Sequence, residues 1–279
     1  MRLDITLTDD AARVIDSAGA FLATEPCLHN VILTLLHTRN VHRVPGRYWV
    51  ASRAGGVTGV VFQSPLHFPA LLSLMDSETV EAMVDAIAAA GVALPSVNGE
   101  AGTAARFAGC WTERSRTGAT PARGQRIYEV ETVGSWAPGP GRFRRAIAAD
   151  RDLLITWTRA FQVEIGEPAD DPVRMVDERL PAGFFWLWED GGPMSLACRS
   201  APVAGVVRIQ MVYTPPGSRR RGYARACTGE ISTQIRAEGY RCMLYADLAN
   251  PVSNALYRDL GYRAVAEALR YDFAAAADE

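Results

Sequence analysis

The sequence predicts an α/β (α+β) protein of two domains. Its 279 residues are enough for two domains of ordinary size, and 48% of them are hydrophobic, which suffices for a core in each. Segments with apolar residues at alternate positions, typical of strands, are interspersed with segments at helical spacing. Residues 135–141, SWAPGPG, hold two Pro-Gly steps that neither a helix nor a central strand accommodates. We expect a linker there, between domains at 1–134 and 142–279.

The first half is expected to begin with two helices and to continue with short strands. Residues 4–24 place apolar side chains on one helical face, with Thr8 or Asp4 as the cap, and Ser77 is the expected N-cap of a later helix. Gly and Pro turns separate the strand-like segments. In order, we expect helices at 4–24 and 28–40, strands at 47–52, 57–63 and 68–74, a helix at 77–90, a strand at 94–97, a helix at 102–116 and a strand at 125–133.

The second half is expected to repeat this order of elements. Asp150 is the expected cap of one helix, and Asp170 or Asp171 begins the next. The turn Asp190-Gly-Gly tolerates positive φ and predicts a hairpin. The shared order indicates a duplicated fold, and two unrelated α/β domains are the alternative. In order, we expect a strand at 142–148, helices at 150–165 and 171–180, strands at 184–189, 193–200 and 204–213, a helix at 222–238, a strand at 241–246, a helix at 251–260 and strands at 262–265 and 269–273.

The charge balance and the cysteines narrow the classes of function. The formal net charge is −2, so no overall field favours nucleic acid or a membrane surface, and any anion site must be local. The five cysteines form no C-x-x-C pair and no histidine stands at metal-ligand spacing, so we expect free, buried thiols and no metal. The N-terminus lacks the pattern of a signal peptide, and no apolar run has the length of a membrane span, so we expect a cytoplasmic protein.

Residues 208–224, RIQMVYTPPGSRRRGYA, are the most informative segment. A strand-like alternation ends at two prolines, and helical spacing begins after Gly222. The first turn of a helix offers unpaired N–H groups and a positive dipole end to an anion. Gly222 permits close approach of a phosphate, Ala224 keeps the next contact small, and the three arginines 219–221 add charge in forked geometry. We interpret the segment as a pyrophosphate site; an ordinary turn with solvated arginines is the alternative.

The corresponding position in the first half has the opposite charge. There the helix at 77–90 follows Met75 and Asp76, and Glu78 lies in its first turn. Carboxylates at this place repel a pyrophosphate. We therefore predict a degenerate first half that binds no cofactor.

Two motifs of the second half resemble those of the GNAT acyltransferases. The spacing Arg219-x-x-Gly222-x-Ala224 resembles the coenzyme A signature of that family. The second motif begins at Asn250-Pro251, and Asn254 and Tyr257 follow three residues apart, hence on one helical face, before a Leu-Gly-Tyr close. The resemblance covers about residues 142–273. It implies tandem GNAT-like domains, each a central mixed sheet flanked by helices, with the acetyltransferase at 142–279.

The resemblance also implies how acetyl-CoA is held. The strand backbone is expected to pair with the pantetheine arm, backbone N–H groups and arginines to hold the pyrophosphate, and two asparagines to hydrogen-bond the arm. Arg220 could instead face the ribose phosphate or solvent. The residues concerned are Met211, Val212 and Tyr213 for the strand, Arg219, Arg220, Arg221, Gly222, Tyr223 and Ala224 for the pyrophosphate, and Asn250 and Asn254 for the arm.

The implied reaction is direct transfer of an acetyl group to a primary amine of a small molecule or peptide. Catalysis then consists of juxtaposition and proton transfer, with a strand N–H near Val212 for the oxyanion. Tyr257 matches the family's general acid, and a core tyrosine is its alternative role. Glu164 and Asp247 are candidate bases, each of which could be a surface carboxylate, and a water relay needs neither. Other functions are a non-catalytic acyl-CoA sensor or scaffold, and an acyltransferase for a specialised small thiol or peptide.

Overall fold

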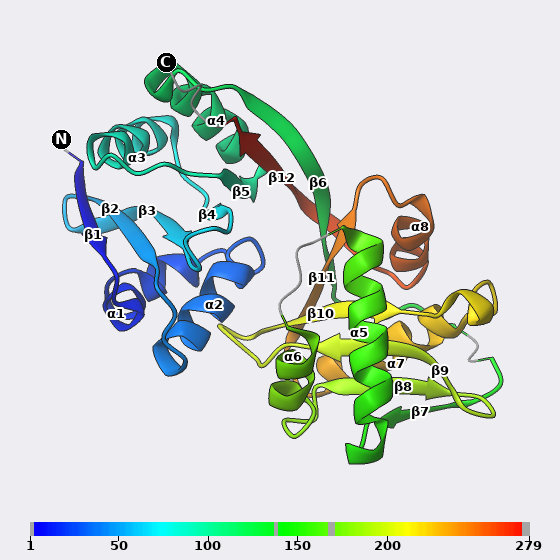
Figure 1. Ribbon diagram of the computed structural model, residues 1–279. Coiled ribbons are helices and arrows are strands. Elements are labelled where there is room, and N and C mark those ends of the chain that lie inside the picture. Colours follow the sequence, from blue (N-terminus) through cyan, green and yellow to red (C-terminus); the bar gives the residue numbers. More distant parts are fainter. Residues whose placement is uncertain (1–2, 137–138, 167–170, 275–279) are drawn as a thin grey trace. The chain divides into compact units, whose positions relative to one another are not determined.

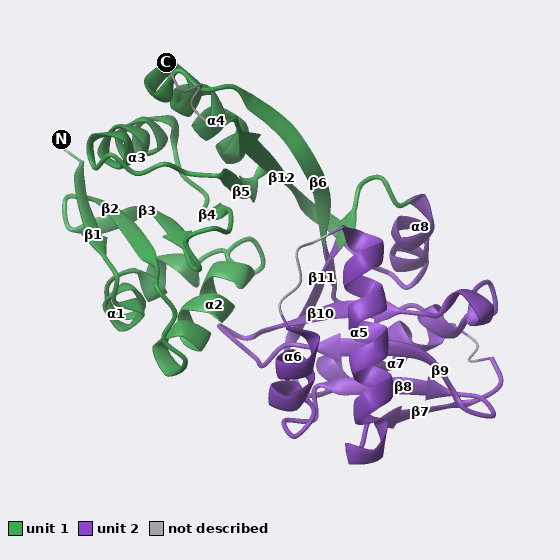
Figure 2. Ribbon diagram, in the orientation of Figure 1, with its two compact units in different colours: residues 1–127, 246–250, 264–279 green, residues 128–245, 251–263 purple. Residues whose placement is uncertain are grey.

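The computed structural model describes residues 3–136, 139–166 and 171–274 (Figure 1). They fall into two compact units (Figure 2). Unit 1 consists of residues 1–127, 246–250 and 264–279, and unit 2 consists of residues 128–245 and 251–263. No single cut of the sequence yields these units, because two C-terminal segments belong with the N-terminal part. Residues 137 and 138 of the expected linker, and Asp170, lie outside the described residues.

Unit 1 is a mixed sheet with helices on both sides. Its strand order is β1-β2-β3-β4-β5-β12-β6, in which β4 and β5 are parallel while β1–β4 pair antiparallel in succession and β12 pairs antiparallel with β5. The elements are β1 (Asp4–Thr8), α1 (Ala11–Leu22), α2 (Asn30–Val41), β2 (Arg47–Arg53), β3 (Gly56–Gln63), β4 (Ala70–Leu72), α3 (Ser77–Ala89), β5 (Ser96–Glu100), α4 (Ala101–Ser115), β6 (Ala119–Val130) and β12 (Arg263–Phe273).

The core of unit 1 lies between its sheet and the helix pair α3 and α4. Val80, Val84 and Ile87 recur at helical spacing on the buried face of α3, and Phe107 and Trp111 do the same on α4. On the other side of the β1–β3 ribbon, α1 and α2 cover the sheet (Figure 1).

Unit 2 is also a mixed sheet between helices. Its strand order is β6-β11-β10-β9-β8-β7, with β10 and β11 parallel and β7 to β10 antiparallel in succession. The predicted hairpin of β8 and β9 and the predicted α/β class are confirmed. The elements are β7 (Arg142–Arg145), α5 (Arg151–Ile165), α6 (Pro172–Arg179), β8 (Phe185–Glu189), β9 (Pro193–Arg199), β10 (Val206–Tyr213), α7 (Tyr223–Ala237), β11 (Arg241–Asp247) and α8 (Pro251–Asp259).

Helices cover both faces of this second sheet. Leu154 and Trp157 of α5 and Val176 of α6 pack in one core with strand residues from β8 to β10. Ile231 and Ile235 of α7 are fully buried, and α7 packs against β8, β9 and β10. Both faces of the aromatic strand β8 are therefore buried.

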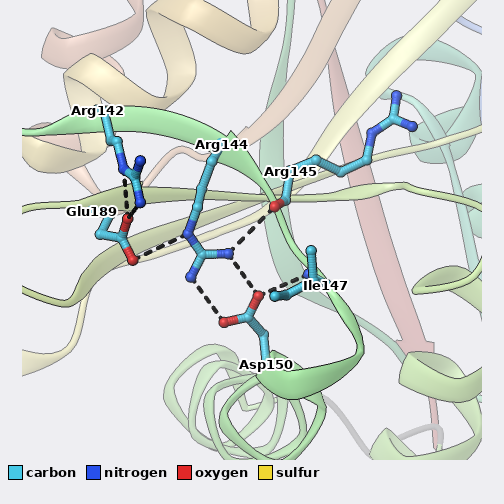
Figure 3. Close-up of polar contacts among 6 residues, drawn as sticks. All are labelled: Arg142, Arg144, Arg145, Ile147, Asp150 and Glu189. Atoms are coloured by element: carbon cyan, nitrogen blue, oxygen red, sulfur yellow. Dashed lines mark hydrogen bonds and ion pairs between the residues drawn. The ribbon is translucent and has the colours of Figure 1, made fainter.

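A charged network fixes the start of α5 to the sheet (Figure 3). Arg144 of β7 donates two hydrogen bonds to the carboxylate of Asp150, over 2.7 and 2.9 Å, and the Ile147 N–H donates a third over 2.8 Å. Glu189 of β8 pairs with Arg144 and with Arg142. The Arg144 guanidinium lowers the pKa of Asp150. Asp150 stands at the predicted cap position, but its carboxylate binds the preceding turn rather than α5.

Three sequence-based predictions of elements are wrong. Residues 4–24 are not one helix, because residues 4–8 pair with β2 and Asp10 then caps α1. The N-cap of α3 is Asp76 rather than Ser77, since the longer side chain of Asp76 accepts from the Thr79 N–H over 2.7 Å. The last two expected strands are one, β12, which pairs with β5 along residues 268–272. In the first and third cases tertiary pairing overrides a local pattern.

Both halves of the sequence have the same order of elements, β-α-α-β-β-β-α-β-α-β. The last strands are exchanged between them. β12, the last strand of the second half, lies between β5 and β6, and β6, the last strand of the first half, lies beside β11. Exchange of this kind explains why a C-terminal strand belongs to unit 1.

Candidate functional site

The strand β10 carries a β-bulge at the residues expected to meet a cofactor. Gln210 is opposite Cys198 of β9 and Tyr213 is opposite Leu196, so Met211 and Val212 together face one residue of β9. Met211 has φ of 52°, in the left-handed region. The register with β11 runs from Val206 and ends at Ile209, although β10 continues to Tyr213. Bulges of this kind free backbone groups from the ladder and are common beside active sites.

The turn after β10 opens α7 without a capping side chain. Its backbone reverses through a 3-10 turn at Pro216–Ser218, with Arg220 at φ 61° and Gly222 at φ 83°. A Cβ on Gly222 would touch nothing within 4 Å, so the requirement for glycine here is conformational. No side-chain hydrogen bond caps α7 in the described part of the chain. The N–H groups of its first turn therefore have no capping side chain as acceptor among the described residues.

The helices α3 and α4 differ in this respect. The side chain of Asp76 caps α3, and Glu100 caps α4 with both carboxylate oxygens. Arg53 pairs with Asp76 and with Glu78 at the same end of α3. The N-terminus of α3 is thus occupied by the chain's own carboxylates, whereas that of α7 is not.

The three arginines of the turn differ in their contacts. Arg219 donates from Nε to the Thr214 carbonyl over 2.9 Å, pairs with Glu164 over 2.6 Å, and lies over the Tyr213 ring. Arg221 lies over the ring of Tyr223, 5.1 Å from its centroid. Arg220 is exposed. Arg219 is therefore held against the end of β10, close to the start of α7.

Tyr223, the first residue of α7, is buried, and its hydroxyl is held by a carboxylate of the turn between β8 and β9. Its hydroxyl donates to Asp190 Oδ2 over 2.5 Å, which raises the pKa of the phenol. Asp190 lies in the turn between β8 and β9, so this bond ties that turn to the start of α7. Sequence reasoning recognised Asp190 only as a turn residue, because nothing local indicates its partner 33 residues away.

The asparagine and the tyrosine of α8 lie in the interior of unit 2. Tyr257 and Asn254 of α8 are both buried. Burial raises the pKa of Tyr257 to about 12, and its ring packs between those of Tyr128 and Tyr262. Asn254 Oδ1 accepts a hydrogen bond from the Tyr128 hydroxyl over 3.0 Å. Tyr128, at the end of β6, was not foreseen as part of this cluster.

The remaining predicted site residues, Asp247, Asn250 and Glu164, lie outside the cluster around Tyr257. Asp247 and Asn250 are residues of unit 1. Asp247 accepts from the Ala249 N–H over 2.8 Å and pairs with Arg123, and the Asn250 N–H donates to the Asp247 carbonyl. Glu164 is half exposed and bound to Arg219. Both candidate bases are thus engaged by guanidinium groups.

Neither a metal-ligand cluster nor a membrane-spanning helix occurs among the described residues. No group of three or more His, Cys, Asp or Glu side chains there could hold a metal ion, and the five cysteines are free. No helix among the same residues is long and apolar enough to cross a membrane.

Known proteins share this fold. Residues 199–271 match the family model described as FR47-like protein. A GNAT-family acetyltransferase from Colwellia psychrerythraea has a TM-score of 0.65 at 8% identity, covering 97% of this chain and 100% of that chain. GCN5-related N-acetyltransferases from Sphaerobacter thermophilus and Kribbella flavida have TM-scores of 0.61 and 0.56 at 15% and 17% identity, covering 96% and 88% of this chain and 94% and 95% of theirs. No curated protein matches the sequence. The whole chain therefore has the fold of these acetyltransferases, as the resemblance of the second half predicts.

Proposed function

Because the chain has the GNAT fold, we propose that it is an acetyl-CoA-dependent N-acetyltransferase of the cytoplasm. The acetyl group passes directly to a primary amine of a small molecule or peptide. One observation carries the proposal. β10 ends in a bulge, and the next helix, α7, begins without a capping side chain beside an arginine-rich turn.

The residues at this place fit a coenzyme A pyrophosphate. The N–H groups of Gly222, Tyr223 and Ala224 are available at the start of α7, and Gly222 has the left-handed backbone that brings them together. Arg219 and Arg221 supply charge, and Arg219 can exchange its exposed partner Glu164 for a phosphate.

The bulge fits the acyl-bearing arm. The backbone of Met211, Val212 and Tyr213 diverges from β11 where the register ends, so its polar groups are available to an extended ligand. Asn250 and Asn254 complete the proposed contacts.

Tyr257 suits the role of general acid. With a pKa raised to about 12, its phenol stays protonated at neutral pH, so it has a proton to give to a departing thiolate. Acetyl-CoA itself supplies an activated thioester. Among the bases, Glu164 and Asp247 are each bound to an arginine, which favours a water relay over either carboxylate.

We further propose that the two halves are tandem GNAT-like repeats and that the first binds no cofactor. The identical order of elements supports the repeat. The carboxylates of Asp76 and Glu78 at the start of α3 support the loss, because they occupy the place that a pyrophosphate would need.

The proposal is tested by calorimetry and by release of free thiol. We expect one acetyl-CoA per chain and thiol release that depends on an added amine from a panel of small amines and peptides. If acetyl-CoA binds but no added amine causes release of its thiol, a non-catalytic acyl-CoA sensor would be favoured. Release with small thiols alone would favour a thiol acyltransferase.

A further inference from the structure

A hairpin turn of the second sheet is joined to the first residue of α7 by a side-chain hydrogen bond. The Tyr223 hydroxyl donates to the Asp190 carboxylate, and Tyr223 is only 2% exposed. Hydrogen bonds to an ionised carboxylate are shorter than those between neutral groups and about twice as strong. This bond therefore gives the first residue of α7 a fixed position relative to the turn between β8 and β9.

The alternation of side chains along β8 brings the two partners together. Glu189 pairs with Arg144, whose guanidinium also binds Asp150 at the start of α5 (Figure 3). Glu189 thus lies on the side of the sheet that α5 covers. Successive strand residues face opposite sides, so the next residue, Asp190, falls on the side of α7. There α7 packs against β8, and Tyr223 meets Asp190.

Tyr223 also contacts one of the arginines proposed to hold the pyrophosphate. The Arg221 guanidinium lies over the Tyr223 ring, 5.1 Å from its centroid. A cation is attracted to the electron-rich face of a phenol ring, and a hydroxyl that donates to a carboxylate polarises the ring further in the same sense. The position of this ring therefore affects both the first N–H groups of α7 and the place of Arg221.

Side-chain contacts hold the turn at residues 219–222 from both ends. At its start, Arg219 donates to the carbonyl that follows β10 over 2.9 Å, and directly after its end Tyr223 binds Asp190. The first N–H groups of α7 have no capping side chain among the described residues. An anion cradle is most effective when its donors are fixed before the anion arrives. The bond to Asp190 provides that fixation at the helix end of the turn.

Resting on the proposed acetyltransferase function, we propose that Asp190 is a positioning residue for acetyl-CoA. It acts through the Tyr223 hydroxyl rather than by touching the cofactor. By holding Tyr223 it keeps the start of α7 and Arg221 in the arrangement that binds the pyrophosphate. The cradle is thereby ordered when the chain folds and not when the cofactor binds, which raises the affinity.

Calorimetry with coenzyme A measures the coupling between the two residues. Asp190→Ala and Tyr223→Phe are each expected to raise the Kd about tenfold, as for loss of a charge-assisted hydrogen bond. The double variant should bind at most about twofold more weakly than Tyr223→Phe alone, because both changes remove the same bond. Glu189→Gln is the matched control: it removes the adjacent carboxylate, on the other side of the sheet, and should leave the Kd within about twofold.

Kinetics with two acyl donors separate positioning from folding. S-acetylpantetheine carries the same thioester as acetyl-CoA but has no pyrophosphate. With an accepted amine, Asp190→Ala should raise the KM for acetyl-CoA about tenfold at unchanged kcat, and its kcat/KM for S-acetylpantetheine should stay within about twofold of wild type. An equal loss with both donors, or a loss that Asp190→Ala still causes in the Tyr223→Phe background, would refute the positioning role.

The binding data also distinguish this role from the function on which it rests. If the wild type and Asp190→Ala bind coenzyme A equally well, the role of Asp190 is overturned and the proposed acetyltransferase is unaffected. If the wild type binds no coenzyme A, both proposals fail. If coenzyme A binds but no amine is acetylated, the Kd values of the single and double variants decide, because binding requires no transfer.

Discussion

Arg219 and Glu164, 55 residues apart in the sequence, form an ion pair of 2.6 Å at the end of β10. One was expected to hold the cofactor pyrophosphate and the other to be a candidate base. Both side chains are about half exposed, so the pair contributes little to stability, on the order of 0–1 kcal/mol. Its significance is that binding of a phosphate and binding of Glu164 compete for one guanidinium.

Substitutions at this pair should therefore affect binding in opposite directions. Arg219→Gln is expected to weaken acetyl-CoA binding about tenfold, the value of one charge-assisted hydrogen bond. Glu164→Gln is expected to leave affinity unchanged or improve it about twofold, since it removes a weak surface competitor. Calorimetry measures both, with Arg159→Gln on α5 as the control. A large loss of kcat in Glu164→Gln at normal affinity would instead make Glu164 the base.

Tyr257→Phe should lower kcat about 100-fold while the Kd for acetyl-CoA stays within twofold, because it removes a proton and keeps the packed ring. The high pKa has a consequence for pH dependence: the phenol remains the acid form through pH 10, so activity should not decline below that pH on its account. Steady-state kinetics from pH 6 to 10 check this. Tyr240→Phe is the control, and equal activity of Tyr257→Phe and wild type would assign Tyr257 to the core alone.

Gly222→Ala should destabilise unit 2 by about 1–2 kcal/mol, since an L side chain is strained at φ of 83°. It should also weaken acetyl-CoA binding by displacing the first N–H groups of α7. Gly217→Ala in the same turn is the matched control, because Gly217 has no positive φ and a Cβ there meets nothing within 4 Å. Urea unfolding and calorimetry on both variants measure the two effects. Equal stability of the two variants would show that the left-handed backbone at 222 is not required.

The buried His29 is expected to make the stability of unit 1 decrease at acidic pH. It is buried and bridges two backbone groups: Leu74 N–H donates to Nε2 over 2.9 Å, so Nδ1 carries the proton and donates to the Leu22 carbonyl. Burial lowers its pKa below the ordinary 6.5. Because the unfolded chain then binds the proton more tightly, the stabilisation is complete above pH 6.5 and declines as pH falls toward the lowered pKa.

Thermal unfolding between pH 7.5 and 5.0 tests this prediction. His29→Gln should lower Tm by about 2–4 °C at pH 7.5 and reduce the further loss at pH 5.0. His37→Gln, at an exposed position of α2, should follow the wild-type pH dependence. Parallel curves for wild type and His29→Gln would contradict the assignment.

Local chemistry made much of the fold predictable. The hairpin at Asp190-Gly-Gly and the start of α7 at Gly222 depend on residues adjacent in sequence, and the structure has both. Residues 4–8 were predicted wrongly because their apolar spacing suits a helix, while pairing with β2 makes them a strand.

The features of the candidate site likewise fall into those set by local sequence and those set by tertiary structure. The sequence by itself determined the arginine-rich turn, its glycine and the asparagine-tyrosine helix, since each is a short segment whose conformation its own residues dictate. Only the tertiary structure decided that Met211 lies in a bulge, that Arg219 pairs with Glu164 and that Tyr223 binds Asp190. These relationships join segments far apart in the chain, and their energies come from packing and from charges brought together, which no local pattern encodes.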